Sequence, residues 1–286
     1  MPGTGNIAKR SPQNDIVRER TITRLLITGA SGLLGANLAL ELDDNYQVYG
    51  LVNSRLIHSD RFEVLQRNLL DEGACEDILD QTRPDVIIHC AGLTEIDHCE
   101  RQPEKAYRLN AELPGRIAKL TRQRGIKLLH LSTATVFDGQ RGEYTEDDSP
   151  NPLSVYAKTK LEGENAVLAA DPQALITRVS IFGWSPSGRR SLAEFFYHNL
   201  RQKNPVTGFT DVTFCPVLVN HCAPIFRRLF EGDYRGIFHV ANPKCVSKYQ
   251  FGRIIAKRFG FQPALVQPGL VGEADLVGDR SRNLTL

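Results

Sequence analysis

The chain of 286 residues is expected to fold as an α/β protein with a doubly wound parallel sheet and a smaller C-terminal α/β lobe. Short apolar strands alternate with amphipathic helical segments through its first two-thirds, which is typical of a parallel sheet covered on both faces. A glycine-rich turn joins the first strand to the first helix. After about residue 182 the alternation ends, and an irregular stretch with Gly, Pro and Ser begins.

The turn has the sequence Thr28-Gly29-Ala30-Ser31-Gly32-Leu33-Leu34-Gly35. Its glycines allow the backbone to turn sharply, to approach a diphosphate and to pack the helix closely on the sheet. The helix N-terminus adds free N–H groups and a positive dipole end, which attract phosphate. Because a strand precedes the turn and a helix follows it, the segment predicts a Rossmann-type dinucleotide site rather than an ordinary glycine-rich turn. The expected contacts are Gly29, Ser31, Gly32, Leu33, Leu34 and Gly35.

Six strands are expected from the apolar runs at 25–27, 47–52, 62–65, 85–90 and 126–131 and from residue 174 onward. Helices are expected at about 71–81, 103–124 and 156–170, and later at 191–202, 219–230 and 247–259. A further strand is expected at 236–240, and residues 205–216 are expected to be irregular.

The predicted domains are a flexible tail (1–20), a Rossmann domain that binds NAD(P) (21–182) and a mainly substrate-binding lobe (183–286). Residues from about 217 to 241 are a candidate to return to the Rossmann sheet. In parallel sheets of this type ligands bind beyond the carboxyl ends of the strands, so chemistry is expected just after the fourth, fifth and sixth strands.

The composition excludes several classes of function. With 35 basic and 33 acidic residues, the net charge of +2 creates no strong field for nucleic acid or a membrane surface. No apolar stretch approaches membrane-spanning length, and the first twenty residues contain no apolar run of a signal peptide. A cytoplasmic protein is expected.

The six cysteines, at positions 75, 90, 99, 215, 222 and 245, form no CxxC pair. This pattern predicts a reducing compartment, with neither a disulfide framework nor a zinc site. His98 lies beside Cys99, but no second ligand pair has metal-site spacing. No metal is therefore expected.

Tyr156 and Lys160 are four residues apart and share one face of a predicted helix. A phenol with a pKa of about 10 is a poor acid–base group at neutral pH until a nearby cation favours the phenolate. Lys160 can supply that charge and can also hold the ribose of a nicotinamide cofactor. A solvated surface pair is the alternative, but the glycine-rich turn and the hydroxyl residue that ends the fifth strand favour catalysis.

With these motifs the chain resembles an extended short-chain dehydrogenase/reductase, and it is most similar to the dTDP-4-dehydrorhamnose reductase family. The resemblance begins near Arg24 and runs to the C-terminus. It is carried by GASGLLG (29–35), CAGLTEIDHCERQPEKAYRLNAELPG (90–115), LSTATVFDG (131–139), NPLSVYAKTKLEGE (151–164), GIFHVAN (236–242), VSKYQFG (246–252) and RSRNLTL (280–286). Relatives generally continue past the position of Leu286, so the chain is expected to be either truncated or naturally short.

The resemblance implies roles for individual residues. Tyr156 would protonate the substrate carbonyl oxygen, Lys160 would lower the Tyr156 pKa, and Thr133 would hydrogen-bond the same oxygen. Asn110 would support the active site from the long helix. Further implied contacts are Cys90, Ala91 and Gly92 to the cofactor, and Thr94, Thr133, Ala134 and Ser180 to the substrate. The alternatives left open are a strand-end cap for Thr133, a helix-surface position for Asn110 and a turn for Thr94.

The cofactor is predicted from the residues after the second strand, Val52-Asn53-Ser54-Arg55. A site for NAD usually has an acidic side chain here, whereas Arg55 could pair with a 2′-phosphate. NADP(H) is therefore expected in preference to NAD(H), which remains possible. Asn53 and Arg55 are expected to contact the ribose side, with Asn68 and Leu69 near the adenine.

The predicted function is an NADPH-dependent reductase of a nucleotide-linked 4-keto-6-deoxy sugar. The family usually has Asp-Tyr where this chain has Ala134-Thr135, which puts the identity of the sugar in doubt. Two alternatives stay open. One is an epimerase or dehydratase of the same superfamily; the other is a non-catalytic NADP-binding subunit resembling the regulatory partner of methionine adenosyltransferase. A nucleotide-sugar substrate is expected, and a homodimer is left open.

Overall fold

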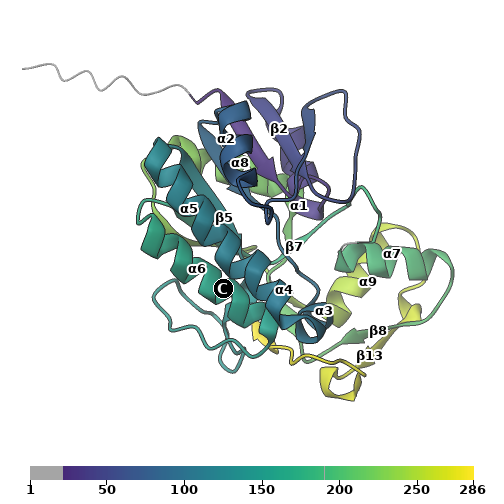
Figure 1. Cartoon of the computed structure of the whole chain (residues 1–286). Helices are drawn as coiled ribbons and strands as arrows, with labels where there is room; N and C mark the ends of the chain where they lie inside the picture. The colour runs from purple at the N-terminus through teal and green to yellow at the C-terminus, as the bar shows by residue number, and fades with distance from the viewer. Residues whose placement is uncertain (1–21, 190) are drawn as a thin grey trace, which may run out of the picture.

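A seven-stranded parallel sheet forms the centre of the computed structural model, which describes residues 22–189 and 191–286 (Figure 1). The predicted tail of residues 1–20 lies outside the described residues. The strand order is β11-β6-β5-β4-β1-β2-β3, which confirms the predicted α/β fold. The strands are β1 (Arg24–Thr28), β2 (Gln47–Val52), β3 (Glu63–Gln66), β4 (Val86–His89), β5 (Lys127–Ser132), β6 (Leu175–Val179) and β11 (Gly236–Val240).

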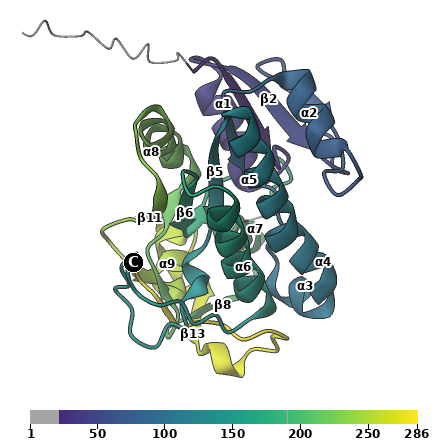
Figure 2. The same cartoon turned by 60° about the vertical axis from the view of Figure 1, so that its left-hand side comes forward.

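Helices cover both faces of this sheet because its strands are apolar on both sides. On one face, α1 (Leu33–Leu42) and α8 (Val219–Glu231) enclose a core with alternate residues of β1 and β4. On the other face lie α2 (Ala74–Thr82), α5 (Leu113–Arg124) and α6 (Val155–Ala170). Figure 2 shows α5 and α6 side by side in front of β5.

The strand order reverses between β1 and β4, which lie side by side at the centre of the sheet. From β1 the polypeptide continues to β2 and β3 on one side of the switch point, and from β4 it continues to β5 and β6 on the other side. Such a switch point opens a crevice beyond the carboxyl ends of the strands. The turn after β1 and the segment after β4 border this crevice.

The long helix predicted at 103–124 is continuous but changes its winding. It consists of α4 (Pro103–Tyr107), the π-helix η1 (Arg108–Glu112) and α5, and Gly125 ends it in the left-handed conformation with φ of 64°. A short helix that the sequence did not predict, α3 (Ile96–Arg101), precedes it.

The C-terminal lobe packs α7 (Leu192–Arg201) and α9 (Lys248–Arg258) around a separate apolar core. The prediction that 205–216 is irregular was wrong, because β8 (Val206–Phe209) and β9 (Thr213–Phe214) lie there. Their partners are distant in sequence: β8 pairs with β13 (Val266–Gly269), and β9 lies between β12 (Val246–Ser247) and β14 (Asn283–Leu284). The remaining short elements are β7 (Ile181–Phe182), β10 (Val217–Leu218), η2 (Ala134–Val136), η3 (Pro263–Leu265) and η4 (Val271–Glu273).

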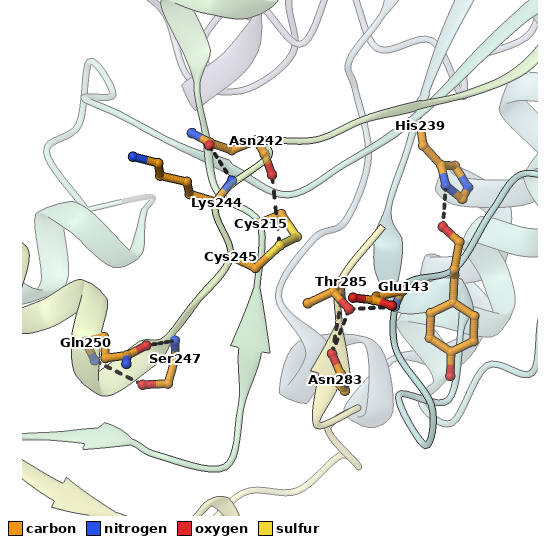
Figure 3. Close-up of a disulfide and its surroundings, with 11 residues drawn as sticks. Glu143, Cys215, His239, Asn242, Lys244, Cys245, Ser247, Gln250, Asn283 and Thr285 are labelled. Carbon is orange, nitrogen blue, oxygen red and sulfur yellow. Dashed lines mark hydrogen bonds between the residues drawn. A yellow bond between two sulfur atoms is a disulfide. The ribbon is translucent and has the colours of Figure 1, made fainter.

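Cys215 and Cys245 form a disulfide, which corrects the prediction of a chain without one (Figure 3). In the antiparallel pair of β9 and β12, Phe214 is opposite Val246. The next residue of one strand and the preceding residue of the other are then opposite each other too, with their Cα atoms 4.1 Å apart. The bond joins two cysteines that are 30 positions apart in the sequence, and the spacing of the cysteines alone does not reveal this pairing.

We expect Cys215→Ser to lower the free energy of unfolding by about 3–4 kcal/mol, because the crosslink restricts the unfolded chain. Urea denaturation followed by circular dichroism measures this change. A phosphine reductant should lower the stability of the wild-type protein to that of the variant and should leave the variant unchanged. Six reactive thiols in the denatured, unreduced wild-type chain, rather than four, would contradict the disulfide.

Candidate functional site

A cavity of about 860 Å³ lies beyond the carboxyl ends of β1, β4 and β5. Its wall brings together residues from the glycine-rich turn, from the ends of four sheet strands and from α6 and α7. Of the predicted site residues, those that line it are Gly29, Ser31, Gly32, Leu33, Leu34, Gly35, Asn53, Arg55, Asn68, Leu69, Cys90, Ala91, Gly92, Thr94, Asn110, Tyr156 and Lys160.

The glycine-rich turn packs so closely that side chains are excluded from two of its positions. Gly29 has φ of +70°, and a Cβ atom there would lie 2.9 Å from the backbone of Ala91. A Cβ atom on Gly35 would lie 2.4 Å from the carbonyl oxygen of Gly29. Helix α1 starts immediately afterwards, and its N-cap residue Gly32 offers no side-chain cap. The first residues of α1 line the cavity, and no side chain of the N-cap residue occupies their N–H groups, as anion binding requires.

Two arginines lie at the end of the cavity formed by β2 and β3. Arg55 follows β2, as predicted, and Arg67 directly follows β3. Both side chains are exposed, and neither forms an ion pair within the described ranges 22–189 and 191–286. Arg67 is not among the residues predicted from the sequence, although its position directly after a strand of a parallel sheet is a signal for a binding residue.

Helix α6 carries Tyr156 and Lys160 on its first turns. Ser154 caps the helix by accepting a hydrogen bond of 3.2 Å from the N–H of Ala157, which fixes where the helix begins. Tyr156 is partly exposed in the cavity wall, and Lys160 is 6% exposed. The Lys160 Nζ donates to the carbonyl oxygen of Leu131 at 2.5 Å and lies 3.3 Å from Nε2 of His130.

The pKa of Tyr156 departs from the prediction. Burial raises it to about 12, and a hydrogen bond with Thr133 only partly opposes this effect. Lys160 does not lower it, because the ammonium group is directed to Leu131 and His130 instead. The expected depression of the tyrosine pKa by Lys160 is therefore wrong for this structure. Burial also lowers the pKa of Lys160 to about 8, against the opposing influences of Glu164 and Cys90.

Asn110 lies in the π-helix and connects three segments around the cavity. Its Oδ1 accepts from the N–H of Leu93 at 2.9 Å, and its Nδ2 donates to the carbonyl oxygen of Leu93 at 2.9 Å and to Oγ1 of Thr159 at 3.1 Å. It thus ties the loop after β4 to the helix that carries Tyr156. The side chain is 1% exposed, which excludes the helix-surface alternative. π-Turns occur frequently at functional sites, and this one directs Asn110 inward.

Three of the predicted substrate contacts are absent from the cavity wall. Thr133 caps η2 by accepting from the N–H of Thr135 at 3.2 Å, so the strand-end cap is real, although Thr133 also bonds to Tyr156. Ala134 is fully buried in the apolar core of the lobe, which corrects its prediction as a substrate contact. Ser180 lies between two lining residues, Val179 and Ile181, without lining the cavity itself. Thr94 does line it.

A buried ion pair holds α6 to the sheet. Arg178 on β6 donates to both carboxylate oxygens of Glu164, with Nη2–Oε2 and Nε–Oε1 distances of 2.6 and 3.0 Å. Ser132 at the end of β5 hydrogen-bonds the same carboxylate, and the guanidinium lies over the Phe137 ring at 5.1 Å. Both charged residues are at most 2% exposed.

No cluster of three or more metal-ligating side chains was found among residues 22–189 and 191–286. Over the same residues, no helix has the length and apolar character needed to span a membrane.

The profile of the RmlD substrate binding domain matches residues 23–286. The chain belongs to this family. Among curated relatives, the probable low-salt glycan biosynthesis reductase Agl14 of Haloferax volcanii is 32% identical, with 91% of this chain and 88% of that protein covered. The methionine adenosyltransferase 2 subunit beta of Bos taurus is also 32% identical, over 92% of this chain and 80% of its own length.

A solved structure of a hypothetical dTDP-4-dehydrorhamnose reductase from Sulfolobus tokodaii superimposes on the chain with a TM-score of 0.81. The two are 31% identical, and the match covers 92% of this chain and 91% of the other. The family predicted from the sequence motifs is thereby confirmed.

We expect Asn110→Ala to lower the free energy of unfolding by about 1–3 kcal/mol, because it leaves the backbone groups of Leu93 without their partners. Chemical denaturation measures the loss. The control is Asn199→Ala on α7, which removes one exposed bond of 2.9 Å to the carbonyl oxygen of Phe195 and should change stability by no more than about 0.5 kcal/mol. Equal effects of the two substitutions would contradict the connecting role of Asn110.

Proposed function

We propose that the chain is an NADPH-dependent reductase of a nucleotide-linked 4-keto-6-deoxy sugar. The observation that carries the proposal is one cavity whose wall contains both the glycine-rich turn and the Tyr156–Lys160 pair. The turn supplies a site for a diphosphate, and the pair supplies a proton donor beside a cation. A carbonyl reductase that uses a dinucleotide needs both in one crevice.

The residues present fit a dinucleotide. The backbone near Gly29 and Ala91 leaves no space for further side chains, and a Cβ atom on Gly92 would lie 2.9 Å from Oδ1 of Asn110. Such a bare backbone surface accepts a flat ring or a diphosphate. The uncapped start of α1 supplies N–H donors for the phosphates.

Two arginine side chains in this site would bind the 2′-phosphate of NADPH. Arg55 and Arg67 line the cavity after β2 and β3, where a carboxylate would instead favour the free ribose hydroxyls of NADH. A guanidinium binds phosphate through a rigid fork of donors. NADPH is therefore the proposed cofactor, with NADH as a weaker alternative.

The chain's own residues would supply the proton and its stabilisation. A bound reduced nicotinamide supplies the hydride that the carbonyl carbon accepts. The Tyr156 phenol, with a pKa raised to about 12, keeps its proton at neutral pH and can donate it to the substrate oxygen. Thr133 holds the phenol through its hydrogen bond, and the Lys160 ammonium in the same cavity wall would bind the nicotinamide ribose.

The substrate class draws on the family and its named relatives. One relative is named as a reductase of glycan biosynthesis and a structural relative as a hypothetical dTDP-4-dehydrorhamnose reductase. Both names support a sugar carbonyl as the group that is reduced. The buried Ala134 offers no carboxylate beside Thr133, which argues against a dehydratase.

A second candidate function is a non-catalytic regulatory subunit. The relatives named methionine adenosyltransferase 2 subunit beta favour it, because they match the chain at 32% identity. The two functions differ in turnover. A regulatory subunit would bind the dinucleotide without oxidising it in the presence of a keto sugar.

Assays of NADPH oxidation with a panel of nucleotide-linked 4-keto-6-deoxy sugars test the proposal. We expect turnover with at least one of them, and we expect Tyr156→Phe to reduce kcat by about 10²–10⁴-fold, because it removes the proton donor. The dissociation constant of NADPH, measured by its fluorescence, should stay unchanged in this variant. NADPH binding without turnover on the whole panel would favour the regulatory subunit.

Cofactor preference is tested by Arg55→Ala and Arg67→Ala. Each substitution should raise the KM for NADPH by about tenfold, since it removes a charge-assisted bond to the 2′-phosphate, and should leave the KM for NADH unchanged. Arg61→Ala is the matched control, because Arg61 lies between the same two strands but pairs with Asp43 and Asp44 outside the cavity wall. The assignment is refuted if the ratio of the KM for NADPH to the KM for NADH is the same in Arg55→Ala, Arg67→Ala and the wild-type protein.

A further inference from the structure

His130 is a buried histidine of β5 that contacts the ammonium group of Lys160. Its Nε2 atom lies 3.3 Å from Nζ of Lys160, and its side chain is fully buried. The adjacent carbonyl oxygen of Leu131 accepts the second hydrogen bond of the same ammonium, at 2.5 Å. Two consecutive residues of one strand thus hold the lysine from the sheet side.

The chemistry of the two groups fixes the direction of the bond. An ammonium group can only donate, so Nε2 of His130 must accept, and the imidazole must carry its single proton on Nδ1. Burial lowers the pKa of His130 well below its ordinary value and so keeps the ring neutral. The neutral ring with its proton on Nδ1 is therefore the form of His130 that can accept a hydrogen bond from Lys160 in this geometry.

This arrangement costs stability, which indicates a role beyond packing. Nδ1 of His130 is buried without a hydrogen-bond partner in the described part of the chain, and so is Nε2 of the neighbouring His89. Unpartnered buried polar atoms are unfavourable, and an apolar side chain at the same strand position would avoid them.

His89 provides an internal comparison. It lies opposite His130 in the register of β4 and β5, and the two ring centroids are 5.4 Å apart. Its Nδ1 is 2.7 Å from Oγ1 of Thr28, which in turn accepts from the N–H of Ala91. His89 is thus equally buried, but its hydrogen bond goes to β1 and not to Lys160.

The other titratable groups around Lys160 are few. They come from its own helix, from the segment after β4 and from the two sheet strands, and they are Glu164, Tyr156, Cys90, His89 and His130. Of these, only His130 is bonded to the Lys160 nitrogen within residues 22–189 and 191–286.

We infer that His130 is a positioning residue for the reductase: its neutral Nδ1–H form accepts a hydrogen bond from Lys160 and holds the ammonium group in the cavity wall, one helical turn from Tyr156. The inference rests on the proposed function, which gives Lys160 its role. It adds a buried side chain, from the middle of the sheet, to the catalytic pair.

The test compares His130→Leu, His130→Gln and His89→Leu. A neutral acceptor favours the charged form of lysine, so His130→Leu should lower the Lys160 pKa from about 8 by roughly one unit. The fall in kcat at rising pH should then begin about one unit lower. His130→Gln retains an acceptor oxygen and should restore the wild-type profile, and His89→Leu should leave the profile in place even if it lowers stability.

Two measurements do not depend on turnover. Titration of ¹³C-labelled lysine by NMR, with the Lys160 signal assigned by its loss in Lys160→Arg, reports the lysine pKa directly. Spectra of ¹⁵N-labelled histidine in the wild-type protein report which nitrogen of His130 carries the proton, so they remain decisive if the leucine variant does not fold.

The inference is overturned by an Nε2–H tautomer at His130, or by a lysine pKa that is the same in the leucine, glutamine and wild-type proteins. Lack of turnover in every protein, including wild type, would instead count against the proposed function. The NMR titrations would still decide the contact between His130 and Lys160.

Discussion

The ion pair of Glu164 and Arg178 fixes the helix on which the proposed chemistry depends. Helix α6 carries Tyr156 and Lys160 at its start and Glu164 one turn later, so the bond to β6 sets the height and rotation of the whole helix. Removal of one partner of such a pair typically costs about 3–5 kcal/mol, because the remaining charge is buried without compensation. The bond from Ser132 extends the same constraint to β5, which provides the carbonyl oxygen and the imidazole that hold Lys160.

Much of the fold could be predicted because its signals are local. Each buried strand of the sheet is a short apolar run, and TGASGLLG combines strand, turn and helix within a few residues. The spacing of Tyr156 and Lys160 likewise places both on one helix face without knowledge of the rest of the chain. The parallel sheet then brings these local motifs together, since the carboxyl ends of all its strands lie on the same side.

The features that could not be predicted depend on tertiary packing. The disulfide arises from the register of β9 against β12, and β8 and β9 are too short to produce an alternating pattern. Ala134 is turned away from the cavity by η2, which the sequence does not mark. The tyrosine pKa depends on where the Lys160 ammonium group points, and that direction is set by acceptors on another strand.

The π-turn at Arg108–Glu112 has a consequence for comparing this chain with its relatives. A π-turn contains one residue more than an α-turn, so a relative with a single deletion here could still align along the full length of both flanking helices. The π-turn absorbs the extra residue within a single turn, so such a deletion would restore a regular α-helix and leave both flanking helices on the same faces, whereas the side chains within the turn would point in new directions. A one-residue gap at this point in an alignment would therefore mark a reoriented amide at position 110, even where every neighbouring residue is identical.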